Sequence, residues 1–474
     1  MHTIDQIYID GAFVTPHGDE RFELFNPATE EVIGTVRLAD EEDTRRAIAA
    51  AKRAFPAFSR TTVAERIALL RRMQAAVEAR GDDLFAAVLE EYGAPVSRGR
   101  WMVQHASSVF LDAIETLEHF AFERRTGTAT VVMQAVGVVG LITPWNSNAG
   151  FICGKLATAI AAGCTAVIKP SEMSALQTRV VTEALHAAGA SAGVFNIVTG
   201  RGDVVGATIV GSPDIAKISF TGSTAVGKGI VRAAADTLKR VTLELGGKSP
   251  VVILDDADFD TAVPLAVMAG FANSGQACIA GTRLLVPRTR LADFESRMAA
   301  AANAVVSGDP SDHATDVGPM VSRKQWDRVQ GYIRKGTEEG ARLIAGGEGR
   351  PDGHSRGWLV RPTVFTGVRN DMTIAREEIF GPVLSIIAYD DEEDAIAIAN
   401  DTPYGLQAYV LSADAARARR VASRIDAGRV LVNTLTHEPK APFGGFKQSG
   451  LGREYGSFGL EAYLEPKALL GVEA

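Results

Sequence analysis

Short apolar segments alternate with alanine-rich segments over residues 136–243, and this alternation limits the possible folds more than any other feature. The apolar segments have the length and β-branched content of buried strands and cover Val136–Ile142, Ala166–Ile168, Val194–Val198, Ile215–Phe220 and Val241–Leu243. The segments between them, such as Leu156–Ala162 and Val180–Ala188, have helical character. Strands that alternate with helices form βαβ units, so we predict a parallel sheet with helices on both faces. Ligands bind such sheets at the carboxyl ends of the strands.

A second alternating series follows the pair Gly246-Gly247. Its predicted strands are Pro250–Leu254, Arg283–Val286, Val383–Tyr389, Ala408–Leu411 and Arg429–Val432. Its predicted helices are Thr261–Asn273, Arg323–Glu339, Asp391–Asn400 and Ala413–Ile425. We therefore predict two α/β domains that join near Gly246-Gly247.

The remaining parts of the chain have other patterns. Residues 1–25 contain short β-prone segments, and residues 40–122 have apolar residues at helical spacing. The segment Thr126–Met133 is β-prone with no helix beside it. We expect it to be an arm or an edge strand that pairs with another subunit.

Composition excludes several classes of function. With 46% apolar and 22% charged residues among 474, the chain is typical of a soluble globular protein. The formal net charge of −8 gives no reason to expect binding to nucleic acid or to an anionic membrane. The chain begins without the features of a signal peptide, and no apolar run reaches the ~20 residues of a membrane span. The three cysteines and eight histidines are dispersed, so we expect a cytoplasmic enzyme that needs no metal.

Cys278 is the candidate nucleophile. Gly275 and Ala277 precede it and leave room for a ligand to approach the thiol. A lone cysteine is more often a small buried apolar residue than a nucleophile. Its interpretation therefore depends on what the strand-end loops place around it.

Two of these loops carry a polar residue that has two possible roles. Asn146, in Thr143-Pro-Trp-Asn146, either caps a helix or donates its amide to a developing oxyanion. Glu172, in Lys169-Pro-Ser-Glu172, either complements a helix N-terminus or joins Lys169 in holding the hydroxyls of a ribose. A carboxylate at this place disfavours a 2′-phosphate and so favours NAD over NADP.

Two more loops complete the set. The loop Phe220–Lys228 is close to the phosphate-loop pattern, but Gly229 lacks the hydroxyl that binds Mg²⁺ in that pattern. It remains a glycine-hinged turn into a helix, which can bind a pyrophosphate. Glu244, before Gly246-Gly247, is either a mobile carboxylate base or a surface residue beside a hinge. A thiol, an amide donor, a carboxylate and a dinucleotide-type loop are what oxidation of an aldehyde through a thioester requires.

With these residues the sequence resembles the aldehyde dehydrogenase superfamily over essentially its whole length. The matching stretches are Thr143–Asn146, Lys169–Glu172, Phe220–Ser223, Glu244–Lys248, Gly275–Cys278, Glu377–Pro382 and Pro442–Gly450. The resemblance implies a Rossmann-like NAD-binding domain (1–123 and 138–246) and a catalytic domain (247–446). It also implies a small β oligomerisation arm with a C-terminal tail (124–137 and 447–474), in a homodimer or homotetramer.

The resemblance implies residue roles as well. Cys278 is the expected nucleophile, Glu244 the general base and Asn146 an oxyanion donor, and Lys155 lines the active site. The expected cofactor contacts are Thr143, Pro144, Trp145, Lys169, Ser171, Glu172, Gly202, Phe220, Thr221, Gly222, Ser223, Val226, Leu245, Gly246, Glu378 and Phe380. The expected cofactor is NAD, with NADP as the alternative. The expected substrate is a small-molecule aldehyde, and the expected substrate contacts are Ser147, Phe151, Ala277, Ile279, His437 and Phe443.

The substrate side departs from many relatives. Ser147-Asn-Ala149 stands where a Phe-Pro pair is common, and Gly154 stands where a large aromatic residue is common. We therefore predict a tunnel that is wider and more polar than one for small aliphatic aldehydes. Three alternatives remain at this point: a CoA-acylating semialdehyde dehydrogenase, a P-loop nucleotide hydrolase and a non-catalytic relative.

Overall fold

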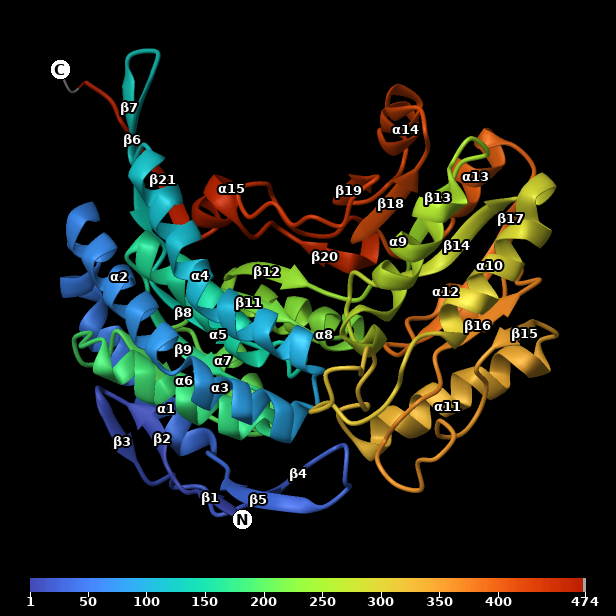
Figure 1. The fold of residues 1–474 in the computed structure, drawn as a ribbon. Coiled ribbons are helices and arrows are strands. Elements are labelled where there is room, and N and C mark those ends of the chain that lie inside the picture. The colour runs from blue at the N-terminus through green and yellow to red at the C-terminus, as the bar shows by residue number, and fades with distance from the viewer. Residues whose placement is uncertain (472–474) are drawn as a thin grey trace.

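The computed structural model describes residues 1–471, and the first alternating series forms an eight-stranded sheet (Figure 1). Its strand order is β20-β12-β11-β8-β9-β10-β2-β3. The strands are β2 (Ile7–Ile9), β3 (Ala12–Val14), β8 (Val138–Ile142), β9 (Thr165–Lys169), β10 (Phe195–Ile197), β11 (Lys217–Thr221), β12 (Arg240–Glu244) and β20 (Gly450–Leu451). The five strands from β12 to β10 pair in parallel, which confirms the predicted parallel sheet.

Helices cover both faces of this sheet. They are α1 (Glu41–Phe58), α2 (Val63–Ala79), α3 (Gly81–Ala87), α4 (Val96–His119), α5 (Asn148–Ala162), α6 (Ala175–Ala187), α7 (Ala207–Gly211) and α8 (Thr224–Ala234). Val139 and Leu141 of β8 pack into one core with α2, α4, α5 and α6, whereas Val138 and Ile142 pack into another with α1 and α7. Side chains alternate between the faces of a strand, so an all-apolar strand such as β8 is buried on both sides.

The second series forms a seven-stranded sheet of order β15-β16-β17-β14-β13-β18-β19. Its strands are β13 (Ser249–Ile253), β14 (Gly281–Pro287), β15 (Arg342–Ala345), β16 (Thr363–Thr366), β17 (Val383–Tyr389), β18 (Gln407–Leu411) and β19 (Arg429–Val432). Only the β15–β16 pair is antiparallel among these described strands. The helices that follow residue 246 are α9 (Phe259–Phe271), α10 (Leu291–Asn303), α11 (Arg323–Glu338), α12 (Thr373–Arg376), α13 (Glu392–Asn400), α14 (Ala415–Ala422) and α15 (Gly456–Glu461).

The predicted helix that precedes Cys278 ends early. The sequence predicts a helix over Thr261–Asn273, but α9 ends at Phe271. Asn273 and Ser274 have φ values of 55° and 58°, so the backbone has left the right-handed region just after the helix. These residues belong to a short turn, η5 (Ala272–Gly275), which leads to Cys278.

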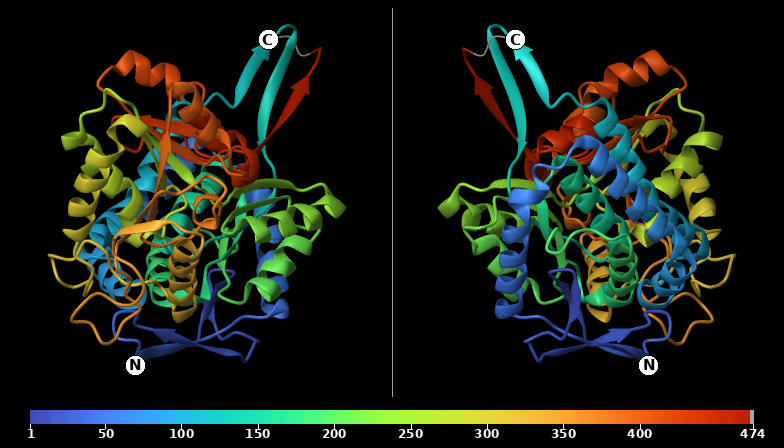
Figure 2. Two further views of the ribbon diagram at one scale, coloured as in Figure 1. Left: turned by 90° about the vertical axis from the view of Figure 1, so that its right-hand side faces the viewer. Right: turned by 90° about the vertical axis from the view of Figure 1, so that its left-hand side faces the viewer.

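Two three-stranded sheets complete the described structure. One, at the N-terminal end, contains β1 (His2–Ile4), β5 (Val32–Arg37) and β4 (Arg21–Phe25). The other contains β21 (Leu464–Leu469), β7 (Ala129–Ala135) and β6 (Glu123–Thr126), and it projects from the body of the molecule (Figure 2). The β-prone segment Thr126–Met133 thus lies in the β6–β7 hairpin, and its pairing with another subunit stays a prediction.

The segment after residue 446 divides between two sheets. Gly450 of β20 pairs with Glu244 of β12 at the edge of the eight-stranded sheet, whereas β21 joins the projecting arm. The tail predicted over 447–474 therefore contributes to both, and residues 472–474 lie outside the described residues. In the described range no helix is both long and apolar enough to cross a membrane.

Candidate active site

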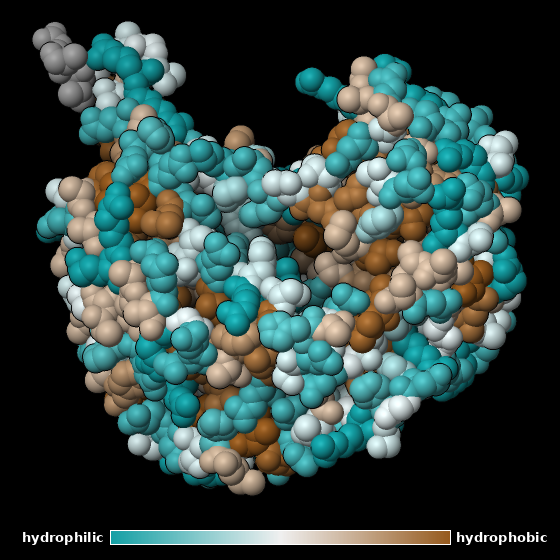
Figure 3. Space-filling model, viewed as in Figure 1, coloured by the Kyte–Doolittle hydropathy of each residue, from teal (hydrophilic) through white to brown (hydrophobic). Residues whose placement is uncertain are grey.

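A cavity of about 500 Å³ lies between the two large sheets. Helices α4 and α5 line it from one side, and β18 and β19 line it from the other. The face in Figure 3 is hollowed between the two halves of the molecule, with apolar residues along the hollow. A volume of this size is ordinary for a small-molecule site.

Cys278 is the only one of the chain's cysteines that lines this cavity, since Cys153 and Cys164 are fully buried elsewhere. The turn before it contains three successive left-handed residues, Asn273, Ser274 and Gly275. A Cβ atom at Gly275 would lie 2.2 Å from the carbonyl oxygen of Gly381, so only glycine fits there. The backbone that presents the thiol is therefore fixed by packing and carries strain, as is common at functional sites.

Asn146 is held against the same turn. Its amide Nδ2 donates a hydrogen bond to the carbonyl oxygen of Gln276 at 2.9 Å. Asn273 Nδ2 donates to the carbonyl oxygen of Asn146 at 3.1 Å. The N-cap of α5 is Ser147, so the reading of Asn146 as the helix cap is wrong. The second amide hydrogen of Asn146 stays available for a ligand.

Glu244 ends β12 and is only 2% exposed, so its reading as a surface residue beside a hinge is wrong. Neither of its carboxyl oxygens has a hydrogen-bond partner among the described residues. A Cβ atom at Gly444 would lie 2.8 Å from Glu244 Oε1, so glycine makes room for the carboxyl group. Burial and the neighbouring Glu454 raise the pKa of Glu244 well above its usual value. A buried carboxyl with a raised pKa that faces a cavity is a candidate general base.

The Cys278 thiol is neutral in this state. Burial first, and then the carboxyl groups of Glu378 and Glu244, raise its pKa to about 12. Its own backbone N–H and the Arg429 guanidinium act in the opposite direction. The thiol therefore needs a nearby base before it can act as a nucleophile.

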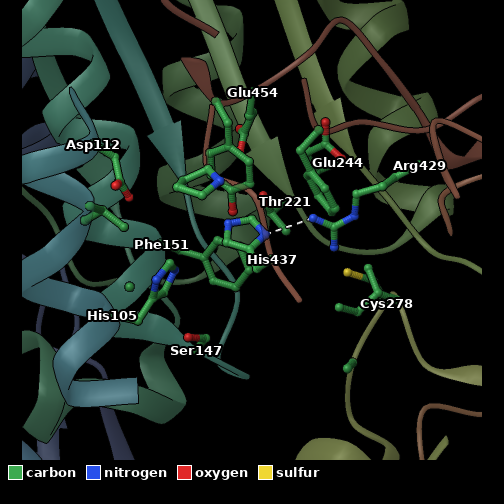
Figure 4. A pocket seen from close by; sticks show the side chains of 18 of the residues that line it. His105, Asp112, Ser147, Phe151, Thr221, Glu244, Cys278, Arg429, His437 and Glu454 are labelled. Carbon is green, nitrogen blue, oxygen red and sulfur yellow. Dashed lines mark hydrogen bonds between the residues drawn. The ribbon is translucent and has the colours of Figure 1, made fainter. Parts of the chain in front are cut away.

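Lys155 lies in a buried polar network at one end of the cavity. Its Nζ donates to Ser219 Oγ at 2.9 Å and pairs with the carboxylate of Glu454. Glu454 also lines the cavity, and Figure 4 shows it on the same side as Glu244. The sequence analysis missed Glu454, although it stands only four residues after the matching stretch Pro442–Gly450.

The predicted cofactor residues gather along one edge of the eight-stranded sheet. Those before residue 250 follow strands β8 to β12, and Glu378 and Phe380 come from the loop between α12 and β17. The chain runs from β8 to β9 and β10 in one direction and continues at β11 on the other side of β8. This reversal is the topological switch point at which open α/β sheets bind dinucleotides.

Within this edge, Ser223 caps α8 by accepting a hydrogen bond from the N–H of Val226 at 3.4 Å. Lys169 Nζ and Glu172 Oε2 are 3.2 Å apart. The hydroxyl groups of Thr143 and Thr221 are buried without a partner in the described structure. A helix N-terminus beside an ion pair and unpartnered donors fits a phosphate and a ribose.

Glu378 approaches the glycine pair from the second sheet. Its carboxylate accepts a hydrogen bond from the N–H of Gly247 at 3.1 Å, and burial raises its pKa to about 7. A Cβ atom at Gly246 would lie 2.5 Å from Glu378 Oε2. The Phe380 ring meets the edge of Trp145 at 5.4 Å between centroids. Glu378, Phe380 and Trp145 therefore lie at the carboxyl edge of the eight-stranded sheet, next to the cavity.

All six predicted substrate residues line the cavity: Ser147, Phe151, Ala277, Ile279, His437 and Phe443. The sequence analysis missed a second wall on α4, where Trp101, His105 and Asp112 face the cavity. Their positions recur at helical spacing, so a polar and aromatic stripe on one helix face was the available signal. It also missed Arg429, which enters the cavity from β19.

One feature bears on the alternative of a P-loop nucleotide hydrolase. Lys228 Nζ donates to Gln448 Oε1 at 2.9 Å, so it is directed to a neighbouring loop rather than over the glycine-hinged turn. In the part of the chain that is described, no group of three or more His, Cys, Asp or Glu side chains has the arrangement of a metal site.

The molecule has two α/β sheets, a dinucleotide-type edge on one of them, and a thiol in the cavity between them. This combination is typical of oxidoreductases that act on carbonyl compounds. A family model described as "Aldehyde dehydrogenase family" matches residues 13–469. The chain belongs to the aldehyde dehydrogenase family.

Similar proteins match along their whole length. A 3-succinoylsemialdehyde-pyridine dehydrogenase from Pseudomonas sp. is 45% identical over 475 residues, with 100% of each chain covered. A crystal structure of a mutant of aldehyde dehydrogenase C from Pseudomonas syringae, with NAD+ and octanal, is 47% identical at a TM-score of 0.97 and covers 99% of this chain and 97% of that one. A Mycobacterium tuberculosis aldehyde dehydrogenase with NAD+ is 38% identical at a TM-score of 0.96, covering 100% and 99%.

Proposed function

We propose that this protein oxidises an aldehyde to the carboxylic acid with NAD through a thioester on Cys278. The observation that carries the proposal is the placement of Glu244. Its carboxyl group is buried without a hydrogen-bond partner in the described structure and opens onto the cavity that contains Cys278 and Asn146. Such a group gains no hydrogen bond from the described fold, and it suits a base that acts on a thiol or a water.

The first step is addition of the thiol to the aldehyde. Glu244, with its raised pKa, is a stronger base than an ordinary carboxylate and takes the proton from Cys278. The sulfur then bonds to the carbonyl carbon, and the oxygen becomes an oxyanion. The free amide hydrogen of Asn146 and the backbone N–H of Cys278 donate to this oxygen. One such donor is worth about 3 kcal/mol in the transition state.

NAD fits the edge of the eight-stranded sheet described above. Lys169 and Glu172 would hold the adenosine ribose, Ser223 the pyrophosphate and Glu378 the nicotinamide ribose. When bound, NAD supplies the acceptor for the hydride that leaves the substrate carbon. The carboxylate of Glu172 favours NAD, and NADP remains the alternative.

The last step is hydrolysis of the thioester. Glu244 first passes the proton from Cys278 to solvent and then accepts a proton from a water, which attacks the acyl carbon. The bond between carbon and sulfur breaks, the acid leaves, and the sulfur takes a proton back to restore the Cys278 thiol. The CoA-acylating alternative needs no such base, so a buried Glu244 that lines the same cavity as the thiol favours hydrolysis. Product analysis with and without CoA separates the two reactions, and an acyl-CoA product would overturn the proposal.

The main experiment measures NADH formation with a panel of aldehydes and both NAD and NADP. The wild-type protein is expected to produce NADH and the free acid. A Glu244→Gln variant is expected to lose most of this activity, because the proposed mechanism uses Glu244 both to deprotonate Cys278 and to activate the water that hydrolyses the thioester. Absence of NADH with every aldehyde would favour the non-catalytic alternative and refute the proposal.

The cavity volume favours an aldehyde bulkier than acetaldehyde. Two of the three relatives named above agree with this, since one was crystallised with octanal and another is named for a succinoylsemialdehyde-pyridine. We also propose a cytoplasmic homodimer or homotetramer joined through the arm of β6, β7 and β21. Relative kcat/KM for acetaldehyde and hexanal tests the first point, and sedimentation of a variant without the β6–β7 hairpin tests the second.

A further inference from the structure

Arg429 is a cation in the cavity wall that has no ion-pair partner among the described residues. It begins β19 and is half-buried. Its Nε donates to Gln407 Oε1 at 2.7 Å, and its Nη1 lies 2.8 Å from His437 Nδ1. The guanidinium also lies over the Phe443 ring, 4.9 Å from its centroid. Within residues 1–471 it makes no ion pair, and Glu244, which faces the same cavity, makes no hydrogen bond with it.

The buried Arg283 is a useful contrast. Its guanidinium donates to three backbone carbonyl oxygens and to Asn370 Oδ1, so that all three of its nitrogens are satisfied. An arginine has five N–H donors, and Arg429 uses only two of them in the described structure. The remaining donors include both hydrogens on Nη2. These free donors belong to a half-buried side chain that lines the cavity, where a ligand can complete their hydrogen bonds.

His437 adds a second donor beside Arg429. Burial first, and then Arg429, lower its pKa to about 4, so the ring is neutral at neutral pH. Arg429 donates to Nδ1, so Nδ1 carries no hydrogen and Nε2 carries the ring proton. Figure 4 shows the His437 ring within the cavity, with the guanidinium of Arg429 on the side of Cys278 and Glu244.

We propose that Arg429 and His437 bind an oxygen acceptor on the tail of the substrate, so that the preferred aldehydes carry a carbonyl or carboxylate oxygen a few bonds from the formyl carbon. This inference rests on the proposed function and names its substrate class. Both donors lie on the wall that also contains Phe443, whose ring would pack against the carbon chain of such a substrate. A site built to donate hydrogen bonds discriminates strongly against an analogue that lacks the acceptor.

The test uses three aldehydes of the same size and branching: 4-methylpentanal, 4-oxopentanal and 4-oxobutanoate. They differ only in whether the end of the tail is two methyl groups, a ketone or a carboxylate. We expect kcat/KM for at least one acceptor-bearing aldehyde to exceed that for 4-methylpentanal by about ten- to a hundredfold. A preference for 4-oxobutanoate alone identifies an anion, and a preference for both identifies any oxygen acceptor. Equal values for all three would overturn the inference.

The variants Arg429→Met and Arg429→Lys show whether the guanidinium is responsible. Methionine removes the donors and is expected to abolish the preference, whereas lysine keeps the charge and retains part of the preference for 4-oxobutanoate. His437→Phe is expected to reduce the preference by a smaller factor. The ratio is taken within each variant, so any effect of Arg429 on the thiol cancels. A preference that survives in Arg429→Met would refute the assignment.

A binding measurement covers the case in which Arg429→Met is inactive. In the Cys278→Ala background, 4-oxopentanoate is expected to raise Tm more than 4-methylpentanoate, and Arg429→Met is expected to remove that difference. An unchanged difference would count against the inference. If the wild-type protein oxidises 4-methylpentanal but shows no preference, only this inference fails. If it oxidises no aldehyde, the proposed function fails as well.

Discussion

The reacting end of the cavity and its tail wall are built in different ways. At the reacting end, Cys278, Asn146 and Glu244 are held by backbone features: a left-handed turn, a buried amide and a glycine that leaves room for a carboxyl. The tail wall consists of side chains on α4, on β19 and in the loop 434–441. A backbone feature restricts which residues can occupy its positions, whereas single side chains on a helix face can be substituted without a change in the backbone. The comparison indicates a fixed reaction and an adjustable substrate preference.

The largest expected effect comes from removing the thiol. Cys278→Ala is expected to lower kcat/KM by about 10⁴-fold or more, because no other group in the cavity can form the thioester. Steady-state NADH formation measures this loss. Cys153→Ala is the matched control, since Cys153 lies in α5 outside the cavity and its loss affects only packing. Comparable losses in both variants would contradict the assignment of Cys278.

A smaller loss is expected from the oxyanion donor. Asn146→Ala is expected to lower kcat by about 10²- to 10³-fold with little change in KM, because the amide acts mainly on the transition state. The nearby Asn148 is a control, because its amide bonds Thr178 at 2.9 Å within the protein. A rise in KM alone for Asn146→Ala would place that amide in the tail wall rather than at the reacting end.

The tail wall should respond by changing preference rather than rate. A Cβ atom at Gly154 would meet Val109 at 3.8 Å, an ordinary contact, so a larger side chain there would extend into the cavity. Gly154→Phe is expected to lower kcat/KM for hexanal about tenfold relative to acetaldehyde. Gly154→Ala should leave the ratio near that of the wild type. An unchanged ratio in Gly154→Phe would contradict the predicted wide tunnel.

The smallest expected effect concerns stability. A carboxyl group whose pKa is raised by folding favours the folded state when protonated and disfavours it once the pH exceeds its unfolded value of about 4.3. Glu244→Gln is therefore expected to raise the free energy of unfolding at about pH 8 by on the order of 1 kcal/mol, and to change it little at about pH 4. Denaturant unfolding at both pH values measures this. A less stable variant at the higher pH would mean that the carboxylate has a partner.

The contrast between backbone features and cavity side chains also explains which parts of the structure could be predicted from the sequence. The parallel sheets and the strand-end position of Glu244 follow from local apolar patterns and motifs, and the structure confirms the fold. The end of α9 at Phe271 did not follow, because Asn273 and Ser274 adopt left-handed backbone only where the surrounding loops pack against them. Arg429 was also missed, because an arginine at the start of a strand is normally exposed. Its proposed role depends on which side chains surround it in the folded structure, and none of those described forms an ion pair with it.

The pairing of β20 with β12 has a consequence for how the protein is made. Glu244 sits on a strand whose edge partner, Gly450–Leu451, comes from the last part of the chain. Domains form from the N-terminus during synthesis, but the strand that carries Glu244 stays unpaired on one side until Leu451 has emerged, about 200 residues later. Chains released from the ribosome before this pairing would therefore lack an ordered carboxyl group at Glu244, the proposed base, and we expect them to be inactive.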